Sequence, residues 1–286
     1  MAAQLFTFPN IDEVAFSIGP LDIRWYELAY IAGIILGWLF MRRTISTGRS
    51  ALTLPQLDSL LNSSIFGIII GGRLGYVLFY NPGLYLADPA AIIRVWEGGM
   101  SFHGGMLGVV AAILFCAHRF GLKPLALADE VAVVAPIGLF FGRIANFING
   151  ELFGRVTSHP FGIVFPNGGP EPRHPSQIYE AVFEGAVLFF LLLLLSRIKQ
   201  RFGLRNGVVM FGFLSGYGMA RFCIEFVRAP DSHVGFFTAF GGLSLTMGQL
   251  LSLPMILIGI AAVSYTHLRA HETEADLVCP RLREKK

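Results

Sequence analysis

Seven hydrophobic stretches, each long enough to cross a bilayer, constrain the fold of this chain more than any other feature. A transmembrane helix needs about 20 predominantly apolar residues. The chain is 54% hydrophobic and only 14% charged over 286 residues, whereas soluble domains average about 25% charged residues. The sequence therefore predicts an all-α polytopic membrane protein with spans at roughly 23–41, 60–80, 101–118, 128–147, 177–196, 207–227 and 246–264.

Lysine and arginine are distributed unevenly between the two sides of the predicted membrane domain. The loops after spans one, three and five carry nine of them, and the loops on the other side carry four: Arg94, Arg155, Arg173 and Arg228. The more basic side is expected to be cytoplasmic. This places the N-terminus outside (periplasmic) and the C-terminus inside. The net charge of +3 is too small to indicate nucleic-acid binding.

The sequence predicts one membrane domain, residues 1–263, with a small extramembrane cap at about 148–176. The cap segment is rich in glycine and proline, and Phe161–Phe165 is predicted to form a short strand within it. Residues 264–286 differ in composition and resemble translated sequencing-adapter read-through. A genuine polar cytoplasmic tail is the other interpretation, and we give neither one functional weight.

A polar run, Gly142–Arg155, leaves the fourth span. Ionisable side chains in membrane segments are costly, so a functional role is the default interpretation. Arg143, Asn146 and Gly150 have i, i+3, i+7 spacing and are predicted to share one helical face. Two polar residues follow where the helix is predicted to end, Asn149 and Glu151. For these two, a helix-terminating hydrogen-bond network and a functional role are equally good interpretations, whereas for Arg143 we favour function.

Further polar residues are predicted on the same side of the membrane. His103 lies among glycines where the chain enters span three, and Gly104 beside it lets a substrate or backbone approach the imidazole. Arg221 and Glu225 are spaced i, i+4 in span six and could be a structural ion pair. The arginines predicted near this side of the membrane outnumber the glutamates that could neutralise them, which indicates an anionic ligand. Arginine suits phosphate because the planar guanidinium group binds a phosphate bidentately.

With these residues, the chain resembles the bacterial prolipoprotein diacylglyceryl transferase family. The resemblance extends from residue 5 to about residue 263. It is carried by ordered motifs: Gly142–Gly154, Ser101–Gly105, Gly71–Tyr80, Arg94–Trp96, Arg173–Gln177, and Gly216-Tyr217-Gly218 with Arg221 and Glu225-Phe226. The resemblance implies a seven-span enzyme of the bacterial inner (cytoplasmic) membrane with its N-terminus outside.

The resemblance also implies the reaction. Such an enzyme moves the diacylglyceryl group of phosphatidylglycerol onto the lipobox cysteine in the signal peptide of a preprolipoprotein. The products are a thioether and glycerol-1-phosphate, and this is the first step of lipoprotein maturation. No metal or soluble cofactor is implied. The chain's own Cys116 and Cys223 are not the nucleophile in this scheme.

Roles for individual residues follow from this chemistry. A thiol with a pKa of about 8.5 reacts only once it is deprotonated, and His103 is the expected base. Arg143 and Arg221 are expected to stabilise the departing phosphate, while Tyr26 and Tyr217 orient the head group or the thiol. Asn146 is expected to donate a hydrogen bond to phosphatidylglycerol, and Glu151 is expected to hold an arginine or asparagine in place. Gly154 is expected to leave room for the backbone beside the substrate. The residues expected to support the structure of the site are Arg73, Gly104, Asn149 and Glu225.

Three other interpretations compete with the transferase. A transporter for an anionic lipid or polyol phosphate would also place arginines between helices, but the sequence has no convincing internal repeat. An intramembrane serine protease would need Ser101 and His103 as a nucleophile–base pair, and two residues on one segment are a poor geometry for that. A purely structural scaffold leaves His103, Arg143, Asn146 and Arg221 unexplained. The sequence therefore favours the transferase.

Overall fold

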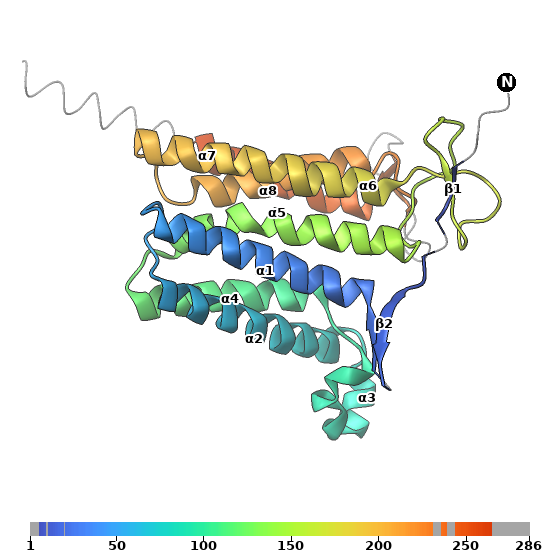
Figure 1. Ribbon diagram of the computed structural model, residues 1–286, viewed down its shortest axis with the longest axis horizontal. Coiled ribbons are helices and arrows are strands. Elements are labelled where there is room, and N and C mark those ends of the chain that lie inside the picture. Colours follow the sequence, from blue (N-terminus) through green and yellow to red (C-terminus); the bar gives the residue numbers. More distant parts are fainter. Residues whose placement is uncertain (1–5, 10, 20, 231–235, 239–243, 265–286) are drawn as a thin grey trace, which may run out of the picture. The chain divides into compact units, whose positions relative to one another are not determined.

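The structure is a computed structural model that describes residues 6–9, 11–19, 21–230, 236–238 and 244–264. It is mainly helical and contains six helices long and apolar enough to cross a membrane: α1 (Trp25–Ser46), α2 (Leu54–Phe79), α4 (Phe102–Phe120), α5 (Pro124–Ile148), Ser176–Phe202 and Met247–Ser264 (Figure 1). The shorter apolar helix α8 (Val208–Ile224) corresponds to the sixth predicted span. The prediction of an all-α membrane protein with about seven spans is confirmed.

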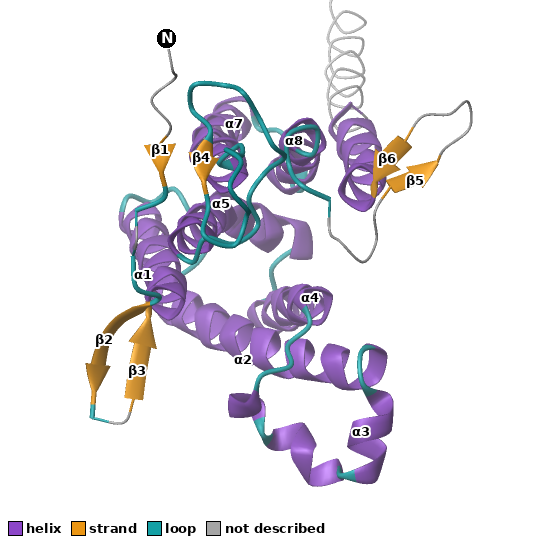
Figure 2. Ribbon diagram, turned by 90° about the vertical axis from the view of Figure 1, so that its right-hand side faces the viewer, coloured by secondary structure: helices purple, strands orange, loops and turns teal. Residues whose placement is uncertain are grey.

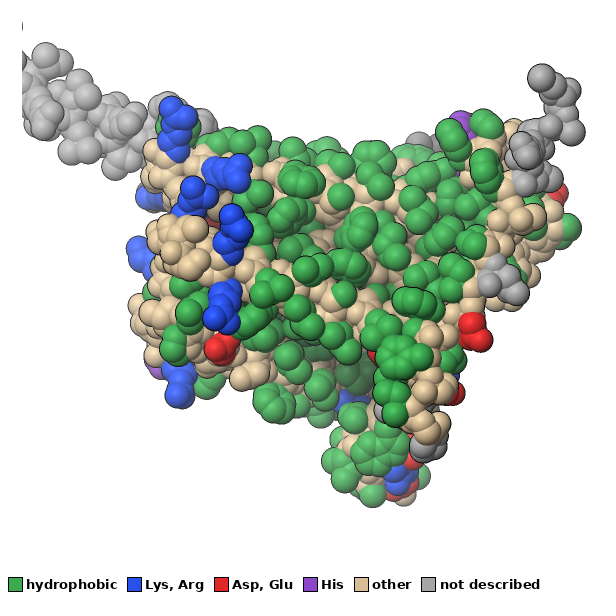
Figure 3. Space-filling view, viewed as in Figure 1, with side chains coloured by type: hydrophobic (Ala, Val, Ile, Leu, Met, Phe, Trp, Pro, Cys, Tyr) green, Lys and Arg blue, Asp and Glu red, His purple; other side chains and the backbone are tan. Residues whose placement is uncertain are grey.

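Hydrophobic side chains cover the lengths of these helices, whereas basic side chains gather at helix ends (Figure 3). Large apolar residues such as Phe66, Leu107 and Phe190 are each more than 60% exposed in the middle of their helices. In water such exposure would be unfavourable, but in a bilayer the lipid tails surround these side chains. The exposed apolar surface is therefore the surface expected of a protein embedded in a membrane.

The chain divides into two compact units, Trp38–Glu130 and Met1–Gly37 with Val131–Lys286. In the first, α2 lies along α4 (Figure 2), and their backbones approach at paired glycines. A Cβ atom on Gly108 would overlap the carbonyl oxygen of Gly67, and one on Gly104 would overlap that of Gly71. Small residues permit this close contact between membrane helices. The space beside Gly104 is thus occupied by the backbone of α2.

We expect Gly108→Ala to destabilise the protein by about 1–3 kcal/mol, because the added methyl group forces two helix backbones apart. The measurement is the free energy of unfolding in detergent. Gly138→Ala is the matched control, since a Cβ atom there meets nothing within 4 Å. If the two variants are equally stable, the α2–α4 contact accommodates the added methyl group without a loss of stability.

A short irregular segment connects α2 and α4. It contains α3 (Pro82–Ala87) and two 3-10 helices, Pro89–Ile93 and Val95–Glu97. The buried guanidinium of Arg73 organises this segment by donating hydrogen bonds to five backbone carbonyls: Ala91, Ile92, Arg94, Gly98 and Gly99. At the surface of the segment, Arg94 pairs with Asp88 and Glu97, and its hydrogen bond lowers the pKa of the Asp88 carboxyl.

In the second unit, α1 and α5 lie side by side, and α8 packs against α7 (Leu188–Phe202). The helix Ser176–Phe202 is not uniform: it begins as α6 (Ser176–Glu180), passes through a π-helical segment at Ala181–Val187, and continues as α7. The helix Met247–Ser264 contacts α8 at Gly218 and Gly259, where a Cβ atom would meet backbone atoms of the other helix. It begins with a capping box, since Thr246 and Gln249 exchange side chain–backbone hydrogen bonds.

The predicted cap segment, 148–176, is irregular, as its composition indicates. The predicted strand within it is present as β4 (Ile163–Val164), which pairs in parallel with β1 (Phe6–Thr7). Phe165 is 1% exposed and contacts the rings of Phe8 and Phe153. The structure also contains two hairpins that were not predicted, β2 (Val14–Ile18) with β3 (Leu21–Arg24) and β5 (Phe236–Thr238) with β6 (Ser244–Thr246). From residue 265 onward, the predicted tail lies outside the described residues.

Candidate active site

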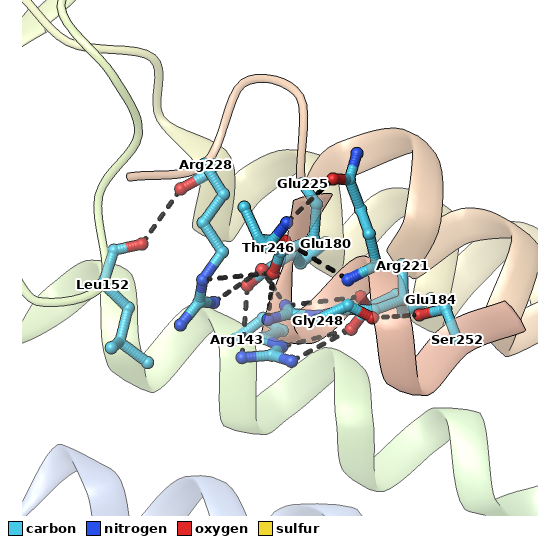
Figure 4. A network of polar contacts seen from close by, with 12 residues as sticks. Arg143, Leu152, Glu180, Glu184, Arg221, Glu225, Arg228, Thr246, Gly248 and Ser252 are labelled. Carbon is cyan, nitrogen blue, oxygen red and sulfur yellow. Dashed lines mark hydrogen bonds and ion pairs between the residues drawn. The ribbon is translucent and has the colours of Figure 1, made fainter. Parts of the chain in front are cut away.

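A cluster of buried ion pairs joins α5, α6, the π-helical segment and α8 (Figure 4). Glu180 is its centre: its carboxylate lies 3.1 Å from Arg143 Nη1, 2.6 Å from Arg221 Nη1 and 2.8 Å from Arg228 Nη1. Glu184 is 3.1 Å from Arg143 Nη2. The predicted Arg221–Glu225 pair is present, at 2.5 Å. One carboxylate therefore contacts three guanidinium groups that come from distant parts of the chain.

The charges of this cluster are balanced, with three arginines and three glutamates. The predicted excess of arginine is therefore not found within it. The negative and positive side chains nevertheless differ in exposure. The side chains of Glu180 and Glu184 are 0% exposed, whereas those of Arg143 and Arg221 are each 16% exposed. The arginines are therefore the members of this group whose side chains are partly exposed. Each of the two guanidinium groups is also paired with two carboxylates, Arg143 with Glu180 and Glu184 and Arg221 with Glu180 and Glu225.

Local sequence explains how these side chains meet. Glu180 and Glu184 are one turn apart, so both point to the same neighbour. Gly185 lets α5 approach this turn closely, since a Cβ atom there would lie 2.6 Å from Cβ of Phe140, and Arg143 lies one turn further along α5. Thr246 donates a hydrogen bond of 2.7 Å to Glu225. Glu180 and Glu184 were not among the site residues predicted from the sequence, although their i, i+4 spacing is visible in it.

Asn146 lies one turn beyond Arg143, and its side-chain amide donates a hydrogen bond of 2.8 Å to Glu151. The prediction that Gly150 shares their helical face is wrong, because α5 ends at Ile148. The helix ends in a Schellman motif: Glu151 N–H donates to Asn146 O, Gly150 N–H donates to Phe147 O, and Gly150 has a φ of +63°. This left-handed glycine turns the chain so that Glu151 folds back onto Asn146.

Gly154 is enclosed by the protein's own backbone. A Cβ atom there would lie 2.5 Å from the carbonyl oxygen of Val227 and 2.7 Å from that of His174, and its N–H donates to the same His174 oxygen. The absence of a side chain at this position is therefore required by packing within the cap segment. Nearby, burial and His159 lower the pKa of the His174 imidazole.

Three tyrosines belong to the same unit as the ion-pair cluster. Tyr217 lies on α8, one turn before Arg221. The hydroxyl of Tyr30 donates a hydrogen bond of 3.4 Å to the hydroxyl of Tyr26, which is in the first turn of α1. Tyr26 and Tyr217 were predicted from the sequence and Tyr30 was not, although its i, i+4 spacing from Tyr26 is visible there.

His103, Gly104 and Arg73 belong to the other compact unit. His103 is exposed in the first turn of α4. Ser101 is the N-cap of this helix, with its buried hydroxyl accepting a hydrogen bond from Gly104 N–H. That structural role disfavours Ser101 as the nucleophile of a serine protease. Among the described residues, no group of three or more His, Cys, Asp or Glu side chains is placed to hold a metal ion.

Comparisons with known proteins agree with these features. The family model described as prolipoprotein diacylglyceryl transferase matches residues 13–265. The chain is 51% identical to the phosphatidylglycerol–prolipoprotein diacylglyceryl transferase of Paramagnetospirillum magneticum, with 90% of this chain and 94% of the relative covered. Its identity to the proteins of the same name is 50% in Methylocella silvestris, covering 93% and 97%, and 48% in Vibrio vulnificus, covering 95% and 97%. The chain therefore belongs to the prolipoprotein diacylglyceryl transferase family.

Proposed function

We propose that the guanidinium groups of Arg143 and Arg221 hold the phosphate of phosphatidylglycerol during diacylglyceryl transfer. As a member of its family, the chain transfers the diacylglyceryl group from phosphatidylglycerol to a prolipoprotein. A carbon–sulfur bond forms between a glyceryl carbon and the lipobox thiol, and the bond from that carbon to the phosphate oxygen breaks. The thiol proton passes to a base, and glycerol-1-phosphate leaves.

The observation that carries this proposal is the arrangement of charge in the ion-pair cluster. Phosphate is a poor leaving group unless the charge that develops on it is stabilised. Oriented donors in a site that excludes water provide such stabilisation without having to reorganise. Glu180 and Glu184 are fully buried and pair with these guanidinium groups, and in this proposal they orient the arginines before substrate binds.

Neighbouring polar groups extend this site. Asn146 has two N–H donors, of which one is used by Glu151, and we assign the other to a glycerol or phosphate oxygen. We assign the orientation of the head group to Tyr217, which lies one turn before Arg221 on α8, and to the hydrogen-bonded pair Tyr26 and Tyr30. Asn149, Glu225 and Arg73 support the fold around the site in this scheme, and Gly104 and Gly154 permit its packing.

The proposal includes the protein partner and the membrane. The partner is the signal peptide of a preprolipoprotein with its lipobox cysteine. The basic residues after spans one, three and five support a cytoplasmic location for those loops. The ion-pair cluster is then at the periplasmic end of its helices, in the inner membrane, with the N-terminus periplasmic and the C-terminus cytoplasmic.

His103 is the proposed base that takes the thiol proton. We expect His103→Ala to lower the transfer rate by about 100- to 10,000-fold, the usual contribution of a general base. The assay uses purified protein, phosphatidylglycerol and a lipobox peptide, and follows the release of glycerol phosphate.

The matched control is His118→Ala, which removes an exposed histidine from the last turn of the same helix and should leave the rate unchanged. Near-normal transfer by His103→Ala would remove this residue from the chemistry. The alternative function is that of a lipid transporter. It would be supported if the unmodified protein moved lipid across vesicle membranes without the peptide and released no glycerol phosphate.

A further inference from the structure

An apolar groove of about 590 Å³ lies between the helix Ser176–Phe202 and α8. Phe183, Val187 and Leu191 form one wall, and Met219, Ala220 and Cys223 form the other. The side chains of Phe183, Leu191 and Met219 are each more than half exposed, so the groove is open along its length. Within the part of the chain that the structure describes, no charged residue lines it, which favours an apolar ligand.

The length of the groove distinguishes between apolar ligands. It extends from Tyr179 to Leu191 along one helix, which corresponds to at most about 18 Å at the 1.5 Å rise per residue of an α-helix. The hydrocarbon core of a bilayer is about 30 Å thick. The groove therefore covers about one leaflet, which matches a lipid acyl chain. A signal-peptide helix that crosses both leaflets would extend well beyond it.

One end of the groove adjoins the ion-pair cluster. Tyr179 and Val227 line this end, and the next residues in the chain, Glu180 and Arg228, form an ion pair of 2.8 Å. The π-helical segment serves both sites, because Glu184 points into the cluster while Phe183 and Val187 line the groove. A lipid whose phosphate is held by the cluster thus has an apolar groove beginning at the same level of the same two helices.

We propose that this groove holds one acyl chain of the phosphatidylglycerol substrate. This inference rests on the proposed function, which places the phosphate at Arg143 and Arg221. It makes the groove a specificity site for chain length, since a chain that fills it to Leu191 gains contacts that a short chain cannot make.

The test uses two variants, each of which introduces a tryptophan about halfway along the groove from one of its two walls. In Ala220→Trp and Val187→Trp we expect kcat/KM for dipalmitoyl phosphatidylglycerol to fall by at least about 10-fold, a usual effect of misfit in an apolar pocket. The value for dihexanoyl phosphatidylglycerol should stay close to that of the unmodified protein. Leu194→Trp is the matched control, because Leu194 is 54% exposed on α7 and does not line the groove. Ala220 is next to Arg221 in the chain, whereas Val187 lies on the other wall. A loss that both variants share therefore cannot come from a disturbance of Arg221 alone.

Equal losses for both lipids in the two groove variants, or no loss for either, would overturn the proposal. A binding measurement separates it from the proposed function. Cys223 lines the groove and is exposed, whereas Cys116 is buried. In a Cys279→Ser background, dipalmitoyl phosphatidylglycerol should slow modification of Cys223 by N-ethylmaleimide, and the dihexanoyl lipid should not.

This protection is expected even if the protein shows no transfer, a result that would contradict only the proposed function. Equal protection by dipalmitoyl phosphatidylethanolamine would show that the groove accepts any lipid and would refute its assignment to the substrate. Protection by the lipobox peptide alone would identify the signal peptide as the occupant and would refute the assignment equally.

Discussion

Replacing Arg143 by alanine should lower the rate of diacylglyceryl transfer by about 100- to 1000-fold, the effect of removing one pre-oriented donor from a developing oxyanion. Arg143 contributes a guanidinium group that Glu180 and Glu184 hold at 3.1 Å each, on a side chain that is 16% exposed. If this group stabilises the departing phosphate, the loss falls mainly on kcat, because the interaction strengthens as charge develops. The measurement is peptide-dependent release of glycerol phosphate at saturating phosphatidylglycerol.

Two further variants make this result specific. Arg143→Lys keeps the charge but loses the planar fork, so it should recover only a small part of the activity. Arg119→Ala, at the end of α4, is the control for removal of an arginine outside the cluster and should be active. Transfer by Arg143→Ala within about threefold of the unmodified protein would exclude the phosphate-binding role, since a donor contributing so little is not stabilising the leaving group.

The second large effect concerns stability. We expect Glu180→Ala to reduce the free energy of unfolding by about 3–5 kcal/mol, the usual cost of removing one partner from a buried ion pair. Glu180 is fully buried and contacts Arg143, Arg221 and Arg228 at 2.6–3.1 Å. Its removal leaves guanidinium groups in an apolar environment with fewer compensating charges. The measurement is equilibrium unfolding of the purified protein in mixed micelles.

Glu97→Ala is the matched control. Glu97 also pairs with an arginine, Arg94, at 2.9 Å, but its side chain is 52% exposed. An exposed pair contributes about 0–1 kcal/mol, so this variant should remain nearly as stable as the unmodified protein. If Glu180→Ala and Glu97→Ala cost the same, Glu180 is not the centre of a tightly coupled cluster. Glu180→Gln should be intermediate, because the amide oxygen still accepts hydrogen bonds from the arginines.

The close approach of helices could be predicted only in part. Glycines in spans two and three indicated tight contact, but not that Gly108 faces Gly67 or that Gly104 faces Gly71. The role of Arg73 was not predictable either, because its partners are backbone carbonyls 18 to 26 residues away. Backbone groups are present at every position, so no residue pattern marks the ones that a buried arginine will find.

The error at Gly150 has a local cause. Extending the helical spacing from Arg143 through Asn146 ignored the Asn149-Gly150 pair, a common helix-ending sequence. A left-handed glycine after Ile148 was therefore available from the sequence as a signal. Only the structure shows its consequence, which is that Glu151 returns to accept a hydrogen bond from Asn146.

The membrane character, the approximate spans and the residue types of the site could be predicted from the amino-acid sequence, because the length of an apolar stretch and the cost of a buried charge are local properties. The ordered motifs were specific enough to predict the family as well. Which charges meet depends on the tertiary structure. Glu180 lies 37 residues from Arg143 and 41 from Arg221, and only the packing of α5, α6 and α8 places one carboxylate between the two arginines. Because Coulomb energy in a medium of low dielectric depends on distance in space, separation along the chain could not predict this cluster.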